Sequence, residues 1–164
     1  SGGLLDVLPV AFHGLVQAVI DLLILYRDVD LVEVVPEAED AYRRAKELAD
    51  VKVQLHCCGG VRPLLDDLID AGLESSNPVQ ITCAGMDPNH LKRTYGDRFT
   101  FWGGGCDTRH VLPLGTPDEV RRNVADLCST WTPNGGFVFQ QVHNILADVP
   151  AENILAMFEA VKAV

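Results

Sequence analysis

The alternation of short β-rich runs with helical patterns, from about residue 30 to residue 164, limits the fold of this chain more than any other feature. Runs rich in β-branched, aliphatic or aromatic residues lie at 31–35, 51–55, 73–80, 99–102 and 137–142. Helical patterns follow them at 36–49, 61–71, 87–95, 116–131 and 150–161. Because a strand, a helix and a further strand pack best as a right-handed crossover, this order predicts a parallel sheet in an α/β fold.

The number of strands limits how such a sheet can close. A closed (β/α)8 barrel needs eight parallel strands and typically about 250 residues. The chain offers five candidate strands in 164 residues. The pattern therefore leaves open a partial or truncated barrel, a barrel with a deleted segment, and a doubly wound open sheet.

The most apolar stretch, residues 4–26, is long enough to be tested as a membrane span, which needs about 20 apolar residues. It contains Asp6, Pro9, His13 and Asp21, and no Lys/Arg cluster flanks it. Because charge in lipid is costly, we expect an amphipathic or buried helix and no membrane association.

Charge and cysteine content narrow the classes of partner. Lys and Arg number 13 and Asp and Glu number 23, which gives a net charge of -10, and the basic residues are scattered. This balance argues against nucleic acid and anionic membranes, which need a cationic face. The odd number of cysteines, five, and the absence of a basic signal-peptide region favour a reducing cytoplasm.

Polar and glycine-rich residues gather where the predicted strands end. Ligand sites of parallel α/β folds form at the carboxyl ends of the strands, so we expect a small-molecule substrate to bind there. The residues concerned are His56, Cys57 and Cys58; Asn77 and Gln80; Gly103 to Asp107; and Gln140, Gln141, His143 and Asn144.

His56 and Cys58 are spaced so that, in an extended segment, both side chains point the same way. An imidazole and a thiolate together favour zinc, and a catalytic zinc needs three protein ligands. The third could come from His143, Cys106 or Asp107. The alternative is a hydrogen-bonded His56 and a Cys58 that packs as a small apolar group.

The glycines Gly103, Gly104 and Gly105 have two interpretations. They could let the backbone approach a ligand or bind an anion through a nest of amides, or they could form a tight loop. We predict a cofactor-binding role for them and for Asn77. Asp107 could act as a general acid or base, hold a ligand, or cap a helix.

Several segments together resemble the uroporphyrinogen decarboxylase superfamily. Residues 56–60 and the helical pattern that follows resemble its HxCG segment, and residues 101–108 resemble its F-x-G-G-x-D-T segment with one residue more. Further matching segments are 77–80, 84–88, 91–92, 112–120, 135–137, 143–145 and 148–155. The resemblance covers about residues 36–164, which divides the chain into an N-terminal helical segment, 1–35, and the C-terminal part of a barrel, 36–164.

The resemblance implies a (β/α)8 TIM-barrel type of fold, here a partial barrel, and an enzyme with one of two chemistries. One branch decarboxylates uroporphyrinogen III in porphyrin biosynthesis without metal. The other moves methyl groups between methyl-corrinoid proteins and a thiol or folate acceptor, with a zinc held by His-x-Cys and a later ligand. His56 and Cys58 look like the methyltransferase branch. His143 stands where coenzyme M methyltransferases carry a cysteine, and a histidine there also resembles the decarboxylases.

The leading hypothesis is therefore a zinc-dependent methyltransferase with His56, Cys58 and His143 as ligands. Gln141 and Asp107 would orient the acceptor or a ligating histidine. A partner protein would present the methyl-corrinoid. The alternatives are the decarboxylase, for which Arg62 and Arg109 are few cations, and a non-catalytic partial barrel that serves as a binding module. Because open sheet edges are normally covered, we also expect a homo-oligomer.

Overall fold

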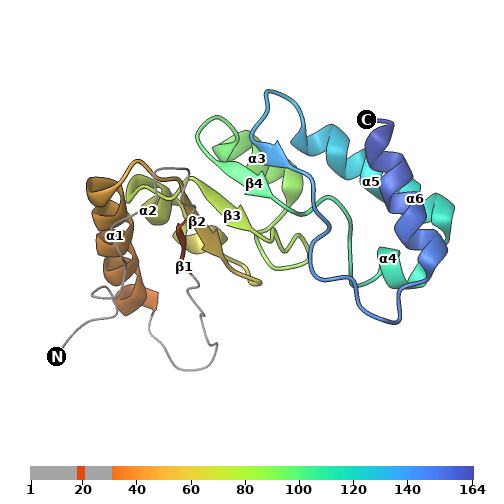
Figure 1. The fold of residues 1–164 in the computed structure, drawn as a ribbon, viewed down its shortest axis with the longest axis horizontal. Helices are drawn as coiled ribbons and strands as arrows, with labels where there is room; N and C mark the ends of the chain where they lie inside the picture. The colour runs from red at the N-terminus through yellow and green to blue at the C-terminus, as the bar shows by residue number, and fades with distance from the viewer. Residues whose placement is uncertain (1–17, 21–30) are drawn as a thin grey trace.

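The computed structural model describes residues 18–20 and 31–164, which form an α/β structure around one parallel sheet (Figure 1). The sheet has five strands in the order β1-β2-β3-β4-β5, and each neighbouring pair is parallel. In the described part of the chain β1 and β5 remain the two edges, so the sheet is open, as a partial barrel requires. The strands are β1 (Ala18–Ile20), β2 (Val53–His56), β3 (Ser75–Asn77), β4 (Thr100–Trp102) and β5 (Phe137–Val138).

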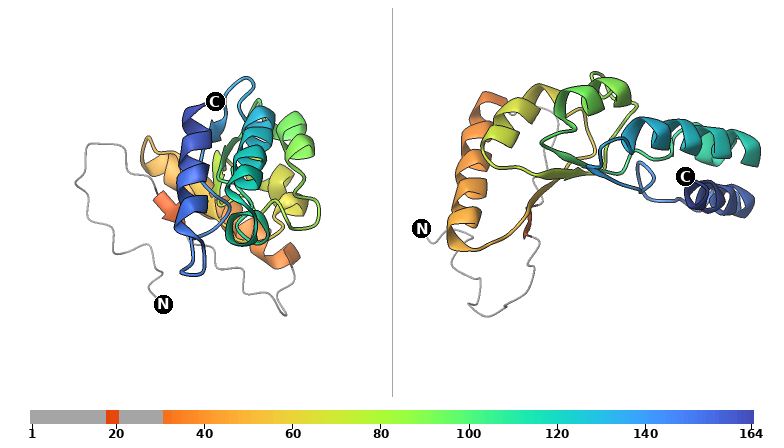
Figure 2. Two further views of the ribbon diagram at one scale, coloured as in Figure 1. Left: turned by 90° about the vertical axis from the view of Figure 1, so that its right-hand side faces the viewer. Right: turned by 90° about the horizontal axis from the view of Figure 1, so that it is seen from above.

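Helices follow the strands along the chain, and α1, α2, α3 and α5 succeed one another along one side of the sheet (Figure 2, right view). The last helix, α6, lies beside α5 at the opposite end of the molecule from α1 (Figure 1). The helices are α1 (Leu31–Leu48), the 3-10 helix η2 (Arg62–Leu64), α2 (Leu65–Asp70), α3 (Pro88–Tyr95), α4 (Val111–Leu114), α5 (Pro117–Trp131) and α6 (Ala151–Lys162).

Two expectations for the N-terminal region are wrong where the structure describes it. Residues 31–35 were expected to form a strand that ends before a helix opened by Pro36. Instead they form the first turns of α1, and Pro36 lies inside the helix. Residues 18–20, expected to be helical, form strand β1. The remainder of the predicted helix over 4–26 lies outside the described residues. Residues 18–20 pair in parallel with β2, and this pairing overrides their local propensity. Residues 31–35 continue the helical pattern of 36–48 toward the N-terminus, since β-branched residues lower helix propensity only slightly.

An aromatic stack joins the sheet to α5. Trp131, at the end of α5, is fully buried, with its ring centroid 4.7 Å from that of Phe101 in β4 and 5.9 Å from that of Phe137 in β5. Its indole Nε1–H donates to the carbonyl oxygen of Gly104 over 3.1 Å. One side chain therefore fixes the helix, two strands and the loop after β4 relative to one another.

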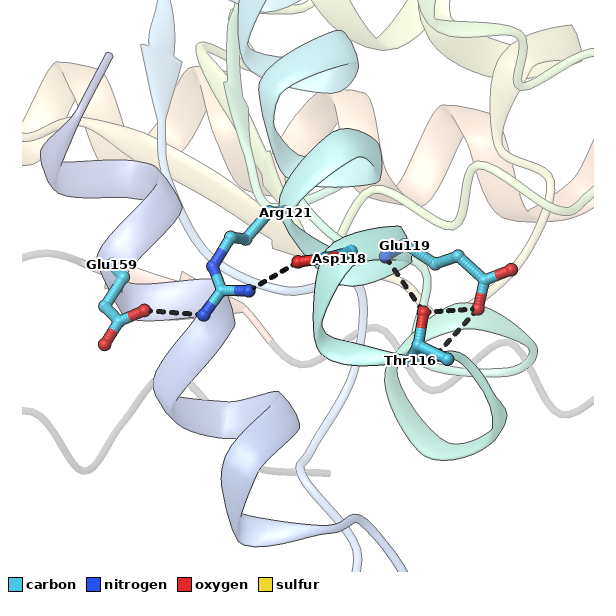
Figure 3. Close-up of polar contacts among 5 residues, drawn as sticks. All are labelled: Thr116, Asp118, Glu119, Arg121 and Glu159. Atoms are coloured by element: carbon cyan, nitrogen blue, oxygen red, sulfur yellow. Dashed lines mark hydrogen bonds and ion pairs between the residues drawn. The ribbon is translucent and has the colours of Figure 1, made fainter.

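Helix α5 begins at a capping box and is tied to α6 by an arginine (Figure 3). The Thr116 hydroxyl accepts from the Glu119 backbone N–H, and the Glu119 carboxylate accepts from the Thr116 N–H over 2.7 Å. Arg121 lies 2.9 Å from both Asp118 in α5 and Glu159 in α6. Beneath this polar layer, Val124 and Met157 pack in a buried cluster that also contains Cys106.

Removing the capping hydroxyl should destabilise the whole chain. We expect Thr116→Ala to lower the free energy of unfolding by about 1 kcal/mol, because the Glu119 backbone N–H loses its hydroxyl acceptor and the Glu119 carboxylate loses the bond from that hydroxyl, which water only partly replaces. Urea denaturation measures the change. Ser129→Ala on the exposed face of the same helix is the control, and its effect should stay within about 0.5 kcal/mol. Equal effects of the two substitutions would contradict the role of the cap.

Glu74 joins α1 to the start of β2. Its carboxylate accepts from Lys52 Nζ over 2.8 Å and from the Val53 backbone N–H over 3.1 Å, and it lies 3.0 Å from Lys46 Nζ. Burial acts to raise the pKa of this carboxyl group, but these hydrogen bonds outweigh it and hold the pKa below its ordinary value of 4.5.

This pKa shift predicts an acid dependence of stability. Because the folded pKa is depressed, the stabilisation by Glu74 is complete above pH 4.5 and is lost as the pH falls through the folded pKa. We expect Glu74→Gln to lower the unfolding free energy at pH 7 and to flatten its decline below pH 4.5, as measured by urea midpoints at a series of pH values. The control is Glu47→Gln at an exposed ion pair within α1. An unchanged acid limb in Glu74→Gln would contradict the assignment.

Candidate functional site

His56 and Cys58 lie together at the carboxyl end of β2. His56 is the last residue of the strand, and its backbone is registered against Asn77 at the end of β3. The Cys57 backbone N–H donates to the Asn77 carbonyl, which holds the chain extended past the strand. The Cys58 Sγ therefore comes to 3.4 Å from His56 Nε2, and both side chains are exposed to solvent.

The separation of these two atoms fits a shared zinc ion. Zinc bonds of about 2.1 Å to nitrogen and 2.3 Å to sulfur at a tetrahedral angle place the two donor atoms about 3.5 Å apart. Although Cys58 is exposed, partial loss of solvent around its sulfur raises the pKa of the thiol above its ordinary value, so the free thiol is protonated at neutral pH. Within residues 18–20 and 31–164, however, no group of three His, Cys, Asp or Glu side chains is placed to hold a metal. The structure therefore brings two potential zinc ligands together, His56 and Cys58, but does not place a third ligand beside them.

A cavity of about 360 Å³ extends from Cys58 across the carboxyl ends of the strands. Its walls come from four segments that are far apart in sequence: Cys58 follows β2, Gln80 follows β3, Arg109 follows β4 and His143 follows β5. The strand-end segments thus share one cavity. His143, the predicted third ligand, lines the same cavity as Cys58, whereas Cys106, another candidate, is buried, and this burial raises its pKa to about 12.

The side-chain amide of Asn77 forms hydrogen bonds to other parts of the protein. Its Nδ2 donates to the Trp102 carbonyl oxygen over 3.1 Å and to Gln140 Oε1 over 2.7 Å. These bonds connect the ends of β3, β4 and the segment after β5. The sequence pattern marked Gln140 as a strand-end residue but gave it no partner, since only the three-dimensional register shows that it meets Asn77. A cofactor-binding role for Asn77 remains a prediction.

The three glycines Gly103, Gly104 and Gly105 are buried and lie against protein atoms. Gly103 and Gly104 have φ angles of +111° and +78°, which side-chain-bearing residues rarely adopt. A Cβ on Gly105 would lie 2.5 Å from the Phe139 ring. Conformation and packing explain why glycine stands here, which is the tight-loop interpretation. The predicted cofactor contact has no further support in the described residues.

Asp107 directs its carboxylate into its own loop. Oδ1 accepts from the backbone N–H groups of Arg109 over 2.7 Å and His110 over 3.1 Å, and Oδ2 lies 3.3 Å from His110 Nδ1. The Asp107 N–H in turn donates to Asn123 Oδ1 in α5. Capping, one of the interpretations of Asp107, is the role that these bonds describe. Gln141, two residues before His143 in the sequence, is half-buried, and its orienting role remains a prediction.

The open parallel sheet, with its helices and its strand-end cavity, is the architecture of a partial β/α barrel. The family model described as Uroporphyrinogen decarboxylase (URO-D) matches residues 32–164, and the chain belongs to this family. No curated protein matches the chain. Among solved structures it is similar to a methyltransferase from Methanosarcina mazei, with a TM-score of 0.61 and 20% sequence identity. That alignment covers 83% of this chain and 38% of the methyltransferase, so the chain spans well under half of that protein's length.

The packing at Gly105 can be tested directly. We expect Gly105→Ala to lower the unfolding free energy by about 1–3 kcal/mol, because the new methyl group displaces the Phe139 ring or the loop. The double variant Gly105→Ala/Phe139→Leu should recover part of that loss relative to Phe139→Leu alone, measured by urea denaturation. Strictly additive effects would show that Gly105 does not depend on this contact.

No helix in the part of the chain that the structure describes is long and apolar enough to cross a membrane.

Proposed function

We propose that this chain carries the zinc-binding part of a methyltransferase that moves a methyl group from a methyl-corrinoid to a thiol acceptor. The observation that carries the proposal is the approach of Cys58 Sγ to His56 Nε2 at 3.4 Å on the rim of a strand-end cavity. Membership of the uroporphyrinogen decarboxylase family and the similarity in fold to a methyltransferase support it.

His56 and Cys58 would hold the zinc ion. His143, which lines the same cavity but is not grouped with the pair among the described residues, would move toward them to supply a third donor. A zinc ion bound there favours the thiolate form of a coordinated thiol near neutral pH. This property favours a thiol over a folate as acceptor. The loops that form the cavity would position the acceptor, with Gln141 orienting it or the ligating histidine. Asp107, predicted to share that role, would act indirectly by holding the loop that carries Arg109.

The proposed reaction is a displacement at the methyl carbon. The acceptor thiol releases its proton to solvent, and its sulfur forms a bond to the methyl carbon while the methyl–cobalt bond breaks. The electron pair of that bond remains on the corrinoid, which is reduced by two electrons, and the products are a thioether and the reduced corrinoid. The chain's part in this step is to hold the sulfur in line with the methyl group and to exclude competing water.

Decarboxylation of a tetrapyrrole is the second candidate, and the charge of the cavity disfavours it. A substrate with many carboxylates needs several cationic partners. Of the two candidate arginines, Arg109 lines the cavity, whereas the stem of Arg62 lies against Gly85. One arginine among the described residues matches a small anion better than a polycarboxylate.

Zinc content and methyl transfer test the proposal together. We expect the purified chain to bind about one zinc per molecule, and His56→Ala and Cys58→Ser to weaken zinc binding by at least about 100-fold, since loss of even an outer-shell partner costs 10–100-fold. Methyl transfer from free methylcobalamin to 2-mercaptoethanol, followed anaerobically by the corrinoid absorbance, should fall in parallel.

The neighbouring residue provides the control. Cys57 packs against the hydrophobic core, so Cys57→Ser should retain zinc binding, while any loss of stability shows in urea denaturation. A folded chain that takes up no zinc from zinc-replete buffer contradicts the metal assignment. Zinc binding without methyl transfer contradicts the methyltransferase and favours the alternative of a binding module.

A further inference from the structure

Three of the five cysteines lie in two loops that contact each other. Cys57 and Cys58 follow β2, and Cys83 lies in the segment between β3 and α3. A Cβ on Gly60 would lie 3.5 Å from the Cys83 Cβ and 3.2 Å from the Ala84 carbonyl oxygen. The chain after β2 therefore passes directly against the segment that carries Cys83, and the fold brings together thiols that are far apart in the sequence.

Cys57 and Cys83 share an environment that Cys58 does not. Both are half-buried and pack against the same hydrophobic cluster, and the Cys57 thiol interacts electrostatically with that of Cys83 as well as with its sequence neighbour. The Cys58 Sγ lies 3.4 Å from His56 Nε2 instead. Because consecutive side chains of an extended segment point to opposite sides, Cys57 and Cys58 are directed apart. Packing and direction therefore pair Cys57 with Cys83.

Backbone hydrogen bonds hold both of these cysteines. The Cys57 N–H donates to the Asn77 carbonyl oxygen over 3.2 Å, which attaches it to the end of β3. The Cys83 N–H donates to the Gln80 carbonyl oxygen over 3.0 Å, and the Cys83 carbonyl oxygen accepts from the Met86 N–H over 3.1 Å. Two thiols on such a frame have a high effective concentration for each other, which favours an intramolecular bond over separate bonds to two small thiols.

The two thiols differ in their access to solvent. Cys83 lines the cavity of about 360 Å³, so a small molecule in the cavity can reach it. Cys57 lies close enough to the fully buried Tyr42 of α1 for the two groups to interact electrostatically. An oxidant that enters the cavity thus meets Cys83 first, and Cys57 is placed to react second. Within residues 18–20 and 31–164 no three His, Cys, Asp or Glu side chains are placed to hold a metal, which favours a bond between two thiols over a metal site.

We propose that Cys57 and Cys83 form a redox-sensitive dithiol, which a small disulfide such as glutathione disulfide converts to a disulfide bond. The Cys83 thiolate attacks one sulfur of the oxidant, whose S–S bond breaks and releases one thiolate. Cys57 then gives up its proton to solvent and attacks the Cys83 sulfur, and the mixed S–S bond breaks to release the second thiolate. The cysteine pair loses two electrons, which reduce the small disulfide to two thiols.

The bond would pin the loop that carries Cys58 to the wall of the cavity. Cys58 itself is not consumed, so the His56–Cys58 pair and the disulfide can exist together. In a reducing compartment such a bond is transient and responds to the thiol balance. The proposal depends neither on zinc nor on methyl transfer, and it stands or fails separately from the proposed function.

Counting free thiols tests the proposal. The purified chain, treated with a chelator, is equilibrated without oxygen in excess glutathione disulfide, and the remaining thiols are alkylated in denaturant and counted by intact mass. Burial raises the pKa of the Cys57 thiol, so the second step is slow at neutral pH and the reaction is run to completion at about pH 8. We expect three alkylated thiols in place of five, and all five again after dithiothreitol. Cleavage before aspartate should give peptide 50–65 bonded to peptide 70–86.

Single substitutions identify the two sulfurs. We expect Cys57→Ser and Cys83→Ser each to abolish the bond, with glutathione remaining on Cys83 in the first. Cys58→Ser should keep the bond, as should the control Cys128→Ser, which lies buried in a different cluster. Urea denaturation verifies that each variant is folded. Five free thiols in the equilibrated chain, a bond that persists in Cys57→Ser or Cys83→Ser, or its loss in Cys58→Ser overturns the proposal.

Discussion

The parallel register between the strands is the constraint on which the candidate site depends. The strands have only two to four residues each, so strand pairing alone provides few hydrogen bonds. The pairing continues beyond them through backbone bonds from Gly103 to Val138, from Gly105 to Gln140 and from Val142 to Cys106. These bonds keep the segments after β4 and β5 side by side beyond the formal ends of the strands. As a result, loops that usually vary in position are held at one edge, where the cavity forms.

Packing around the loop after β4 explains how the carboxyl edge of the sheet is held in place although this loop has no regular secondary structure. The loop after β4 lies between Val79 on one side and Phe139 on the other. A Cβ on Gly105 would collide with the Phe139 ring, and one on Gly103 or Gly104 would crowd Val79. Trp131 holds the same loop through the hydrogen bond that its indole N–H donates to the Gly104 carbonyl oxygen. Close packing of this kind restricts the loop, because even a small displacement of its backbone would bring it into contact with neighbouring atoms. The loop that carries Arg109 is therefore built on a fixed base, although the arginine itself is exposed.

Much of the fold could be predicted from the sequence, because its signals were local. The Thr-Pro-Asp-Glu start of α5 and the carboxyl-terminal helix follow from capping and periodicity, and the i, i+2 spacing placed His56 next to Cys58. Residues 31–35 were misinterpreted because their β-branched residues suit a strand as well as a helix, and only tertiary context decides. Arg109 had no local signal for its place in the cavity. That place depends on the Asp107 turn and on the meeting of four loops, which no short pattern encodes.

The distribution of metal donors over the fold has a thermodynamic consequence. His56 and Cys58 come from one short segment, which the Cys57–Asn77 backbone bond holds against β3, whereas His143 follows β5, three strands away from β2 across the sheet. Its backbone neighbour Val142 is buried and bonded to Cys106, so the segment that carries the imidazole is anchored in the described chain. An ion that joined all three would therefore link β2 to β5 directly and cross-link a sheet whose edges are otherwise open. Since a ligand that binds only the folded state adds its binding free energy to folding, an ion held by these three donors would stabilise the sheet itself.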